Sequence, residues 1–286
     1  MAAASRIEIS SVQALLAWAA PALAAAGATA RLDAELLLAF ATGWRRSTVV
    51  AFPERIVDEQ TAARFQHAIA RRARGEPLAY VTGRKEFFSI ALDVTPAVLI
   101  PRPETELLVE EILARFPRSN AHAVLDLGTG SGALALAIKQ HRPAADVWAV
   151  DVSGSALTIA RGNALRLGLD VHWVQSDWFA ALDGRRFDAI LCNPPYVRSD
   201  DAALSGALSF EPRLALDGGS DGLQALRVLL DQAPAHLTAD GLLLLEHGYD
   251  QRSAVLELGA AAGFDAIATR GDLAGHERMV VLRSLR

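Results

Sequence analysis

Asn193, Pro194, Pro195 and Tyr196 stand in a row about two thirds of the way along the chain, and their types suit the binding of an amide or an amine. They follow the apolar run 189–192, which is typical of a short buried strand. Two prolines cannot continue a central strand, because proline lacks an N–H and its φ is fixed. The chain is therefore expected to turn here and to leave the polar atoms of Asn193 and Tyr196 free at the carboxyl edge of a sheet. Open α/β sheets bind their ligands at that edge.

The four side chains and their backbone offer acceptors for a planar NH₂ group. Asn193 has a side-chain carbonyl and Pro194 a backbone carbonyl with no N–H beside it, so the two together can accept both hydrogens. Tyr196 can lie flat against the attached π system. The tetrapeptide contains no strong base, so it predicts a site that positions and polarises its substrate. A plain proline turn, in which Asn193 bonds its own backbone, is an alternative that the tetrapeptide alone leaves open.

A glycine-rich stretch gives the second chemical signal. It lies where a strand pattern gives way to a helix pattern and reads Asp126-Leu127-Gly128-Thr129-Gly130-Ser131-Gly132. Glycines let the backbone turn tightly and approach a ligand closely. Asp151 follows 23 residues after Gly128 and ends the next strand pattern, where a carboxylate can accept hydrogen bonds from both hydroxyls of a ribose. Loop and acid together predict a nucleoside-binding site.

The nucleoside itself is less well specified by these residues. Trp178 can cover an adenine ring while Asp177 accepts from its amino group, although a tryptophan also often serves only to anchor packing. The spacing of Gly128, Gly130 and Ala133 also fits the relaxed dinucleotide fingerprint, so NAD stays open on this pattern alone.

Composition limits the function classes. The chain has 286 residues, of which 51% are hydrophobic and 21% charged, as in a globular enzyme. Residues 1–80 hold 9 Lys and Arg against 7 Asp and Glu, and residues 81–286 hold 19 against 26, so the larger part has a net charge of −7. This balance argues against direct nucleic-acid binding.

Cys192 is the single cysteine and is interpreted as a small buried residue closing a strand, which fits a cytoplasmic protein. We expect no metal site, no membrane segment and no export signal.

The elements that position these motifs follow a strand–helix alternation from residue 122 onward. Helix patterns lie between most of the strand patterns, near 132–141, 153–168, 221–236 and 250–262. The strand patterns are 123–127, 147–150, 171–174, 187–192 and 242–246, followed by 265–269 and 278–282 without a helix between them. The alternation predicts an α/β fold with a doubly wound, mostly parallel, seven-stranded sheet, and the last pair predicts a hairpin at one edge.

The first part of the chain has a different pattern. Residues 1–76 are expected to form a small helical bundle, with helices after Ser10-Ser11, near 32–40 and over 58–74. Residues 77–102 are expected to be a linker with a β-hairpin, whose strands are 87–94 and 98–100. Residues 101–106 fit a helix start and a functional loop equally well. Residues 103–286 form the expected catalytic domain.

Taken together, the glycine stretch, Asp151 and the tetrapeptide resemble S-adenosylmethionine-dependent methyltransferases that act on amide or exocyclic nitrogens. With residues 88–90, 99–106 and 211–216 added, the chain resembles the peptide chain release factor glutamine methyltransferases, also called protein-(glutamine-N5) methyltransferases. The likeness is strong from about residue 77 to 223.

The resemblance implies an enzyme that methylates the side-chain nitrogen N5 of the glutamine in the Gly-Gly-Gln motif of class 1 release factors. It implies S-adenosylmethionine on residues 128–132, Asp151 and Trp178, with Asn193 near both cofactor and substrate, and residues 193–196 holding the glutamine. It also implies that the helical domain docks the release factor. Alternatives are a ribosomal-protein glutamine or adenine N6 in DNA as substrate, a non-catalytic cofactor-binding docking module, and an NAD-dependent oxidoreductase.

Overall fold

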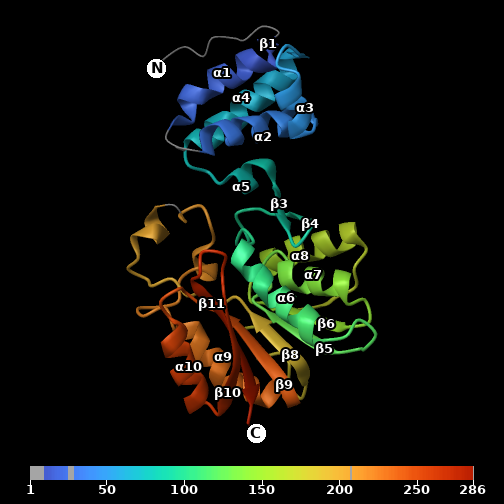
Figure 1. Ribbon diagram of the computed structural model, residues 1–286, viewed down its shortest axis with the longest axis vertical. Helices are drawn as coiled ribbons and strands as arrows, with labels where there is room; N and C mark the ends of the chain where they lie inside the picture. The colour runs from blue at the N-terminus through green and yellow to red at the C-terminus, as the bar shows by residue number, and fades with distance from the viewer. Residues whose placement is uncertain (1–9, 25–28, 207, 286) are drawn as a thin grey trace. The chain divides into compact units, whose positions relative to one another are not determined.

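The computed structural model of the chain describes residues 10–24, 29–206 and 208–285 (Figure 1). The chain divides into two compact units, Met1–Gly83 and Arg84–Arg286. The division falls between the domain boundaries expected at residues 76 and 102. Among the described residues, no helix combines the length and the hydropathy of a membrane span.

The first unit is helical, as the sequence predicts. Its described elements are β1 (Ser10–Ser11), α1 (Val12–Ala22), α2 (Ala30–Thr42), α3 (Arg46–Ala51), β2 (Ile56–Val57), α4 (Glu59–Ala73) and α5 (Leu78–Thr82). The side chain of Ser11 caps α1 by accepting from the N–H of Ala14, and Asp58 caps α4 in the same way. The three predicted helices are thereby confirmed. The short α3 and α5, and the pairing of β1 with β2, were not predicted, because stretches this short carry too little periodic pattern.

A β-hairpin opens the second unit, but its position differs from the prediction. The strands are β3 (Arg84–Phe87) and β4 (Ile90–Asp93), joined by a two-residue turn at Phe88 and Ser89. Both turn residues have positive φ, 46° and 63°. Two-residue hairpin turns need such angles, and they are normally supplied by Asn or Gly. The strand expected at 87–94 contains β4 but runs through the turn, because Phe-Ser gives no turn signal in the sequence, and the strand expected at 98–100 was wrong.

The second unit is built on a seven-stranded sheet among the described residues, in the order β10-β11-β9-β8-β5-β6-β7. Its strands are β5 (Ala123–Leu127), β6 (Asp146–Asp151), β7 (His172–Gln175), β8 (Phe187–Cys192), β9 (Leu237–Glu246), β10 (Phe264–Gly271) and β11 (Glu277–Ser284). Strands β5 to β9 are parallel, and β10 and β11 form an antiparallel hairpin at one edge. The predicted doubly wound sheet with its edge hairpin is confirmed.

Helices cover both faces of this sheet (Figure 1). One face packs on α6 (Glu106–Arg115), α7 (Ala133–His141) and α8 (Gly154–Leu167), and the other on α9 (Gln224–Gln232) and α10 (Arg252–Ala261). Alternate residues of each central strand enter the two cores; in β9, Leu244 joins the first core and Leu243 and Leu245 join the second. Burial on both faces explains why the parallel strands have continuous apolar sequences.

Candidate active site

The glycine loop between β5 and α7 turns through three residues with positive φ: Gly128 at 71°, Gly130 at 55° and Gly132 at 85°. A Cβ at Gly132 would lie 3.0 Å from Leu136 and 3.2 Å from Trp173, so this glycine lets α7 pack closely on its neighbours. A Cβ at Gly130 would meet nothing within 4 Å. Gly130 lines the cavity described below, and its bare backbone therefore leaves room for a ligand.

Asp126 lies buried beneath this loop and holds its shape. One carboxylate oxygen accepts from Thr129 Oγ1 at 2.6 Å and from the N–H of Ala135 at 3.1 Å. Burial raises the pKa of Asp126 to about 7. Thr129 and Ser131 are buried, and the Ser131 carbonyl accepts from Asn163. These two predicted cofactor residues shape the loop from inside and do not line the cavity.

Asp151 ends β6 with both carboxylate oxygens anchored by backbone. Its Oδ2 accepts from the N–H of Gly130 at 2.9 Å, and its Oδ1 accepts from the N–H of Ser153 at 2.9 Å. Burial raises the pKa of Asp151, and the two hydrogen bonds oppose that rise. A carboxylate has about four acceptor positions, so each oxygen keeps a lone pair for a ligand.

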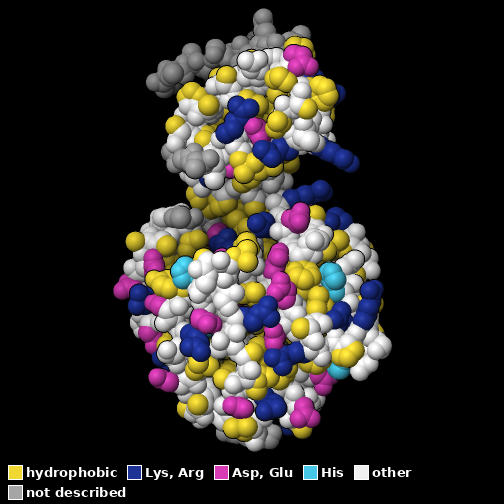
Figure 2. All heavy atoms as spheres, in the orientation of Figure 1, with side chains coloured by type: hydrophobic (Ala, Val, Ile, Leu, Met, Phe, Trp, Pro, Cys, Tyr) yellow, Lys and Arg dark blue, Asp and Glu magenta, His cyan; other side chains and the backbone are white. Residues whose placement is uncertain are grey.

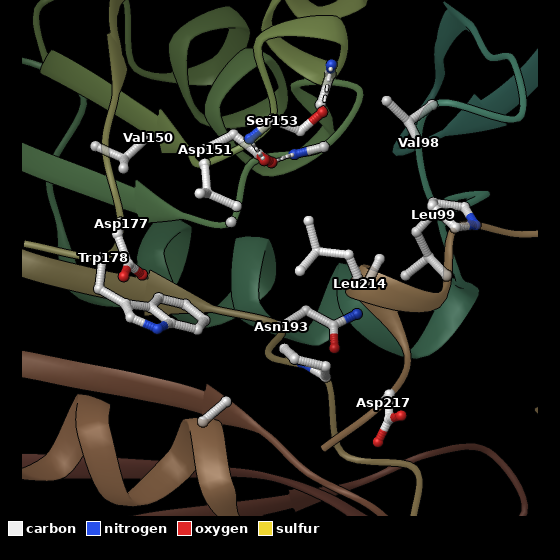
Figure 3. A pocket seen from close by; sticks show the side chains of 18 of the residues that line it. Val98, Leu99, Val150, Asp151, Ser153, Asp177, Trp178, Asn193, Leu214 and Asp217 are labelled. Carbon is white, nitrogen blue, oxygen red and sulfur yellow. Dashed lines mark hydrogen bonds between the residues drawn. The ribbon is translucent and has the colours of Figure 1, made fainter. Parts of the chain in front are cut away.

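A cavity of about 450 Å³ lies at the carboxyl edge of the sheet and collects most of the predicted residues. Its lining includes Gly128, Gly130, Asp151, Trp178 and Asn193. In Figure 3, Asp151 and Trp178 lie on one side of this opening, Val98 and Leu99 on the other, and Asn193 between them below Leu214. The cavity is mostly apolar with a few polar groups, as is usual in small-molecule sites. Of the tetrapeptide, Pro195 also lines it, whereas Pro194 and Tyr196 do not.

The expectation that the polar atoms of Asn193 and Tyr196 are free is corrected for two of them, the Asn193 NH₂ group and the Tyr196 hydroxyl, which are engaged. Asn193 Nδ2 donates to Thr105 Oγ1 at 3.0 Å, and Thr105 Oγ1 donates to Glu246 Oε2 at 2.7 Å. The Tyr196 hydroxyl donates to Glu246 Oε1 at 3.1 Å. Glu246, the last residue of β9, is 1% exposed, and its burial raises its pKa to about 7.

The chain after the tetrapeptide is fixed by close backbone packing. Val197 N–H donates to the Leu216 carbonyl at 2.9 Å, and Gly218 N–H donates to the Val197 carbonyl at 2.7 Å. A Cβ at Gly218 would lie 2.7 Å from the Pro195 carbonyl oxygen and 2.8 Å from the Cα of Tyr196. The tetrapeptide is therefore held by a segment that only glycine can bring so near.

Comparison with known proteins assigns the family. Two family models match, "PrmC N-terminal domain" over residues 14–83 and "Methyltransferase small domain" over residues 103–210. The chain is 52% identical to the release factor glutamine methyltransferase of Pseudomonas aeruginosa over 255 residues, covering 88% of this chain and 92% of that protein. For the enzyme of the same name from Burkholderia pseudomallei, the identity is 48% over 255 residues, with coverages of 86% and 90%. This chain belongs to the release factor glutamine methyltransferase family.

A solved structure agrees with this assignment at the level of fold. A methyltransferase from Pyrococcus furiosus matches with a TM-score of 0.52 at 19% identity, covering 76% of this chain and 98% of that one. The chain is thus a methyltransferase, and the NAD-dependent oxidoreductase and the non-catalytic docking module are set aside.

Three participants in the site were missed by the sequence analysis. Glu246 could have been found from the sequence, because it is an acid at the end of an apolar strand pattern, as Asp151 is. Thr105 lies in the stretch 101–106, which fits a functional loop as well as a helix start, but its own role depends on a contact across 88 residues to Asn193. The third is Glu211, which accepts from the N–H of Ile100 at 3.0 Å and from the Arg102 guanidinium at 2.5 Å, and so ties together two segments that wall the cavity.

Cys192 is buried at the end of β8, as predicted. Burial raises the pKa of its thiol well above the usual value, so the thiolate needed for nucleophilic chemistry is suppressed.

Proposed function

We propose that this enzyme transfers the methyl group of S-adenosylmethionine to the side-chain amide nitrogen of the glutamine in the Gly-Gly-Gln motif of class 1 release factors. The observation that carries the proposal is the place of Asn193, which lines the same cavity as Asp151 and Trp178 and has its Nδ2 already bonded to Thr105. Its carbonyl oxygen is thereby left for an NH₂ group of a substrate.

The cavity fits the proposed cofactor. The lone pairs left on the Asp151 carboxylate suit two ribose hydroxyls, and the bare backbone at Gly130 gives the ligand room. Trp178 offers an aromatic face to an adenine ring, with the Asp177 carboxylate beside it (Figure 3). When bound, S-adenosylmethionine supplies an electrophilic methyl group on a sulfonium. Thr129, Ser131 and Gly132 serve this site by shaping the loop.

The residues of the tetrapeptide suit a poor nucleophile. The lone pair of an amide nitrogen is delocalised into its carbonyl, so the nitrogen must be aligned and polarised before it reacts. Oδ1 of Asn193, a residue that lines the cavity, accepts one N–H of the glutamine amide, and the backbone carbonyl of the next residue, Pro194, which does not itself line the cavity, is the proposed acceptor of the other. The two hydrogen bonds raise electron density on nitrogen and fix its direction. Orientation of this kind is worth about 7–11 kcal/mol in favourable cases.

The transfer needs no strong base beside the nitrogen. A C–N bond forms as the C–S bond breaks, the sulfonium becomes a neutral thioether, and the nitrogen then releases one proton. Once the methyl group has arrived, that nitrogen is acidic enough to give its proton to water. The carboxylate of Glu246 is occupied by two hydroxyls and does not line the cavity.

A protein substrate is favoured over DNA by the charge of the enzyme. A DNA adenine methyltransferase needs a basic face for phosphates and a way to flip the base out of the helix. Residues 81–286 have a net charge of −7. On the face shown in Figure 2, acidic and basic side chains are interspersed over the second unit. Relatives from two bacteria with at least 48% identity carry release factor in their names, which supports the same substrate here.

The direct test is to supply labelled S-adenosylmethionine with purified class 1 release factors, ribosomal proteins and DNA, and to map the label. We expect it on the glutamine of the Gly-Gly-Gln motif alone. A release factor carrying Asn in place of that glutamine is the matched control and should remain unlabelled. Label on a ribosomal-protein glutamine or on adenine, with the release factor unlabelled, would overturn the proposal.

Replacing Asn193 tests the acceptor grip. Asn193→Ala removes one of the two proposed acceptors of the amide, so methyl transfer should fall by at least about a hundredfold, as when one polarising group of a reacting centre is lost. Cofactor binding should weaken only modestly, because Asp151 and Trp178 remain. Full activity in a rapid-quench assay would contradict the role of Asn193.

A further inference from the structure

The amide of Asn193 has two chemically opposite ends, and only one of them suits the proposed reaction. The carbonyl end accepts a hydrogen bond from a substrate NH₂, whereas the NH₂ end would donate to the substrate and oppose it. The two ends have nearly the same shape, so the cavity wall alone cannot select between them. The selection must come from a neighbour that tells a donor from an acceptor.

Thr105 is that neighbour, and its hydroxyl is itself committed. Thr105 lies in the turn Pro103–Thr105 that precedes α6, and it is 5% exposed. Its O–H donates to Glu246 Oε2 at 2.7 Å, so its oxygen is left to accept, and it accepts from Asn193 Nδ2 at 3.0 Å. A hydroxyl has one hydrogen to give; because Glu246 takes it, Thr105 cannot donate to the carbonyl end of Asn193.

We infer that Thr105 and Glu246 are positioning residues that fix the amide of Asn193 with Oδ1 toward the acceptor nitrogen. Neither residue lines the cavity, and both are buried. Both act through Asn193. The inference rests on the proposed function, because it assigns the direction of the hydrogen bond to the amide.

The surroundings of Glu246 fit this role. Its second oxygen accepts from the Tyr196 hydroxyl, so one carboxylate is linked to both ends of the tetrapeptide, to Tyr196 directly and to Asn193 through Thr105. Burying a carboxylate is costly unless it is well bonded, and this acid is 1% exposed and follows the buried leucines 242–245. The charged groups that influence Glu246 are Glu104, which raises its pKa, and Arg278, which lowers it.

Exchanging the hydroxyl of Thr105 for a methyl group tests the first link. Thr105→Val keeps the shape but lets the Asn193 amide turn, so kcat should fall by roughly tenfold or more, the equivalent of about one hydrogen bond, with the cofactor Kd unchanged. Thr105→Ser restores the hydroxyl and should restore kcat. Thr238→Val is the matched control and should behave as wild type. Thr238 lies near the start of β9, the strand that ends at Glu246, and its hydroxyl donates to the Asp188 carboxylate. Equal losses in Thr105→Val and Thr105→Ser would overturn the inference.

A second measurement reads the direction of the amide itself. A release factor with Glu in place of the methylated glutamine presents a carboxylate, which two carbonyl acceptors repel. It should inhibit the wild-type enzyme weakly. In Thr105→Val the NH₂ end of Asn193 can face that carboxylate. The inhibition constant of the Glu-containing release factor should therefore fall by about tenfold relative to the KM for the normal release factor. A purely structural loss weakens both together, and an unchanged ratio would refute the assigned direction.

A double-mutant cycle tests whether Glu246 acts on Asn193 through Thr105. Glu246→Leu removes the acceptor for the Thr105 hydroxyl, so the double variant with Thr105→Val should lose little more kcat than either single variant. Fully additive losses would show that Glu246 acts elsewhere. Melting temperature and cofactor Kd, measured on every variant, show that each one is folded. Failure of the proposed function is visible separately, as a wild-type enzyme that leaves the release-factor glutamine unlabelled.

Discussion

Asp151 supports the glycine loop and also presents acceptors to the cavity. Each of its oxygens accepts one backbone N–H, from Gly130 and from Ser153. Asp151→Asn keeps the shape of the side chain but replaces one carboxylate oxygen by an NH₂ group. That group is a donor and cannot accept a hydrogen bond from a backbone N–H or from a ribose hydroxyl. The Kd for S-adenosylmethionine should rise by about ten- to a hundredfold, which corresponds to about 1.5–3 kcal/mol for a hydrogen bond to a charged group. Calorimetry measures this directly. Asp146→Asn, at the other end of β6, is the control, and a Kd unchanged in both variants would contradict the ribose assignment.

Asp126 gives the fold a specific pH dependence. Burial raises its pKa from 3.8 to about 7, so the folded state holds the proton more tightly than the unfolded state. The contribution of Asp126 to the free energy of unfolding is fully present below about pH 4 and is lost as the pH rises to about 7. Its upper bound is about 4 kcal/mol.

Denaturant unfolding of Asp126→Asn between about pH 4 and pH 8 tests this. The variant should lack that part of the decline in unfolding free energy, while Thr129 and Ala135 keep an acceptor in the carbonyl oxygen of the introduced amide. Parallel curves for wild type and variant would mean that Asp126 is ionised in the folded protein across the range.

At the residue scale, the sequence predicts the groups that line the cavity better than those behind them. Asn193, Asp151 and Trp178 have types suited to a ligand and lie at the ends of strand patterns, so they could be found without coordinates. Thr105 and Glu246 meet Asn193 only through tertiary packing. For the same reason, the expectation of free polar atoms was wrong for the Asn193 NH₂ group and for the Tyr196 hydroxyl.

At the scale of elements, the loop 193–197 depends on the backbone that packs against it. Gly218→Ala would put a Cβ 2.7 Å from the Pro195 carbonyl oxygen, closer than real contacts allow, so the loop must move. We expect a loss of about 1–3 kcal/mol of stability, as in overpacked sites, and a large fall in kcat.

Gly162→Ala provides the comparison. Gly162 lies inside α8, where a Cβ would meet nothing within 4 Å, so alanine should stabilise the protein by about 0.5–1 kcal/mol and leave activity intact. Thermal melting and initial rates separate the two variants. A Gly218→Ala enzyme with normal rates would show that the loop tolerates displacement.

Elements were predictable where burial imposes a repeating pattern. The five parallel strands and the edge hairpin follow from apolar runs separated by helix-length segments. The β3–β4 hairpin was misplaced because Phe88 and Ser89 adopt φ values that their types disfavour. The N–H of Phe88 donates to Glu106 Oε1 at 2.8 Å, so a distant contact supports the turn. No local sequence signal encodes such support.

At the scale of the whole molecule, the two units have separate hydrophobic cores. One core is built from residues 12–81, and the others from residues 87–282. We propose that the first unit docks the release factor, while the cavity residues all lie in the second.

A protein comprising residues 84–286 should therefore bind S-adenosylmethionine with a Kd within about twofold of the full chain, because unaltered distant sites act additively. Its KM for an intact release factor should rise by more than about tenfold, the loss of roughly 1.4 kcal/mol of docking energy. A short Gly-Gly-Gln peptide, too small to reach a second unit, should be methylated equally by both proteins. Equal KM values for the intact release factor would remove the docking role.

The bond from Thr105 to Glu246 joins positions 141 residues apart. During synthesis, the glycine loop, Asp151 and Trp178 all emerge before the strand that ends in Glu246, so an unfinished polypeptide already carries the groups proposed to receive the nucleoside. In that polypeptide, the Asn193 amide is not yet bonded through Thr105 to Glu246, so the proposed acceptor for the substrate nitrogen is not yet oriented. The direction proposed for the Asn193 amide is thereby set only when the last parallel strand has been inserted.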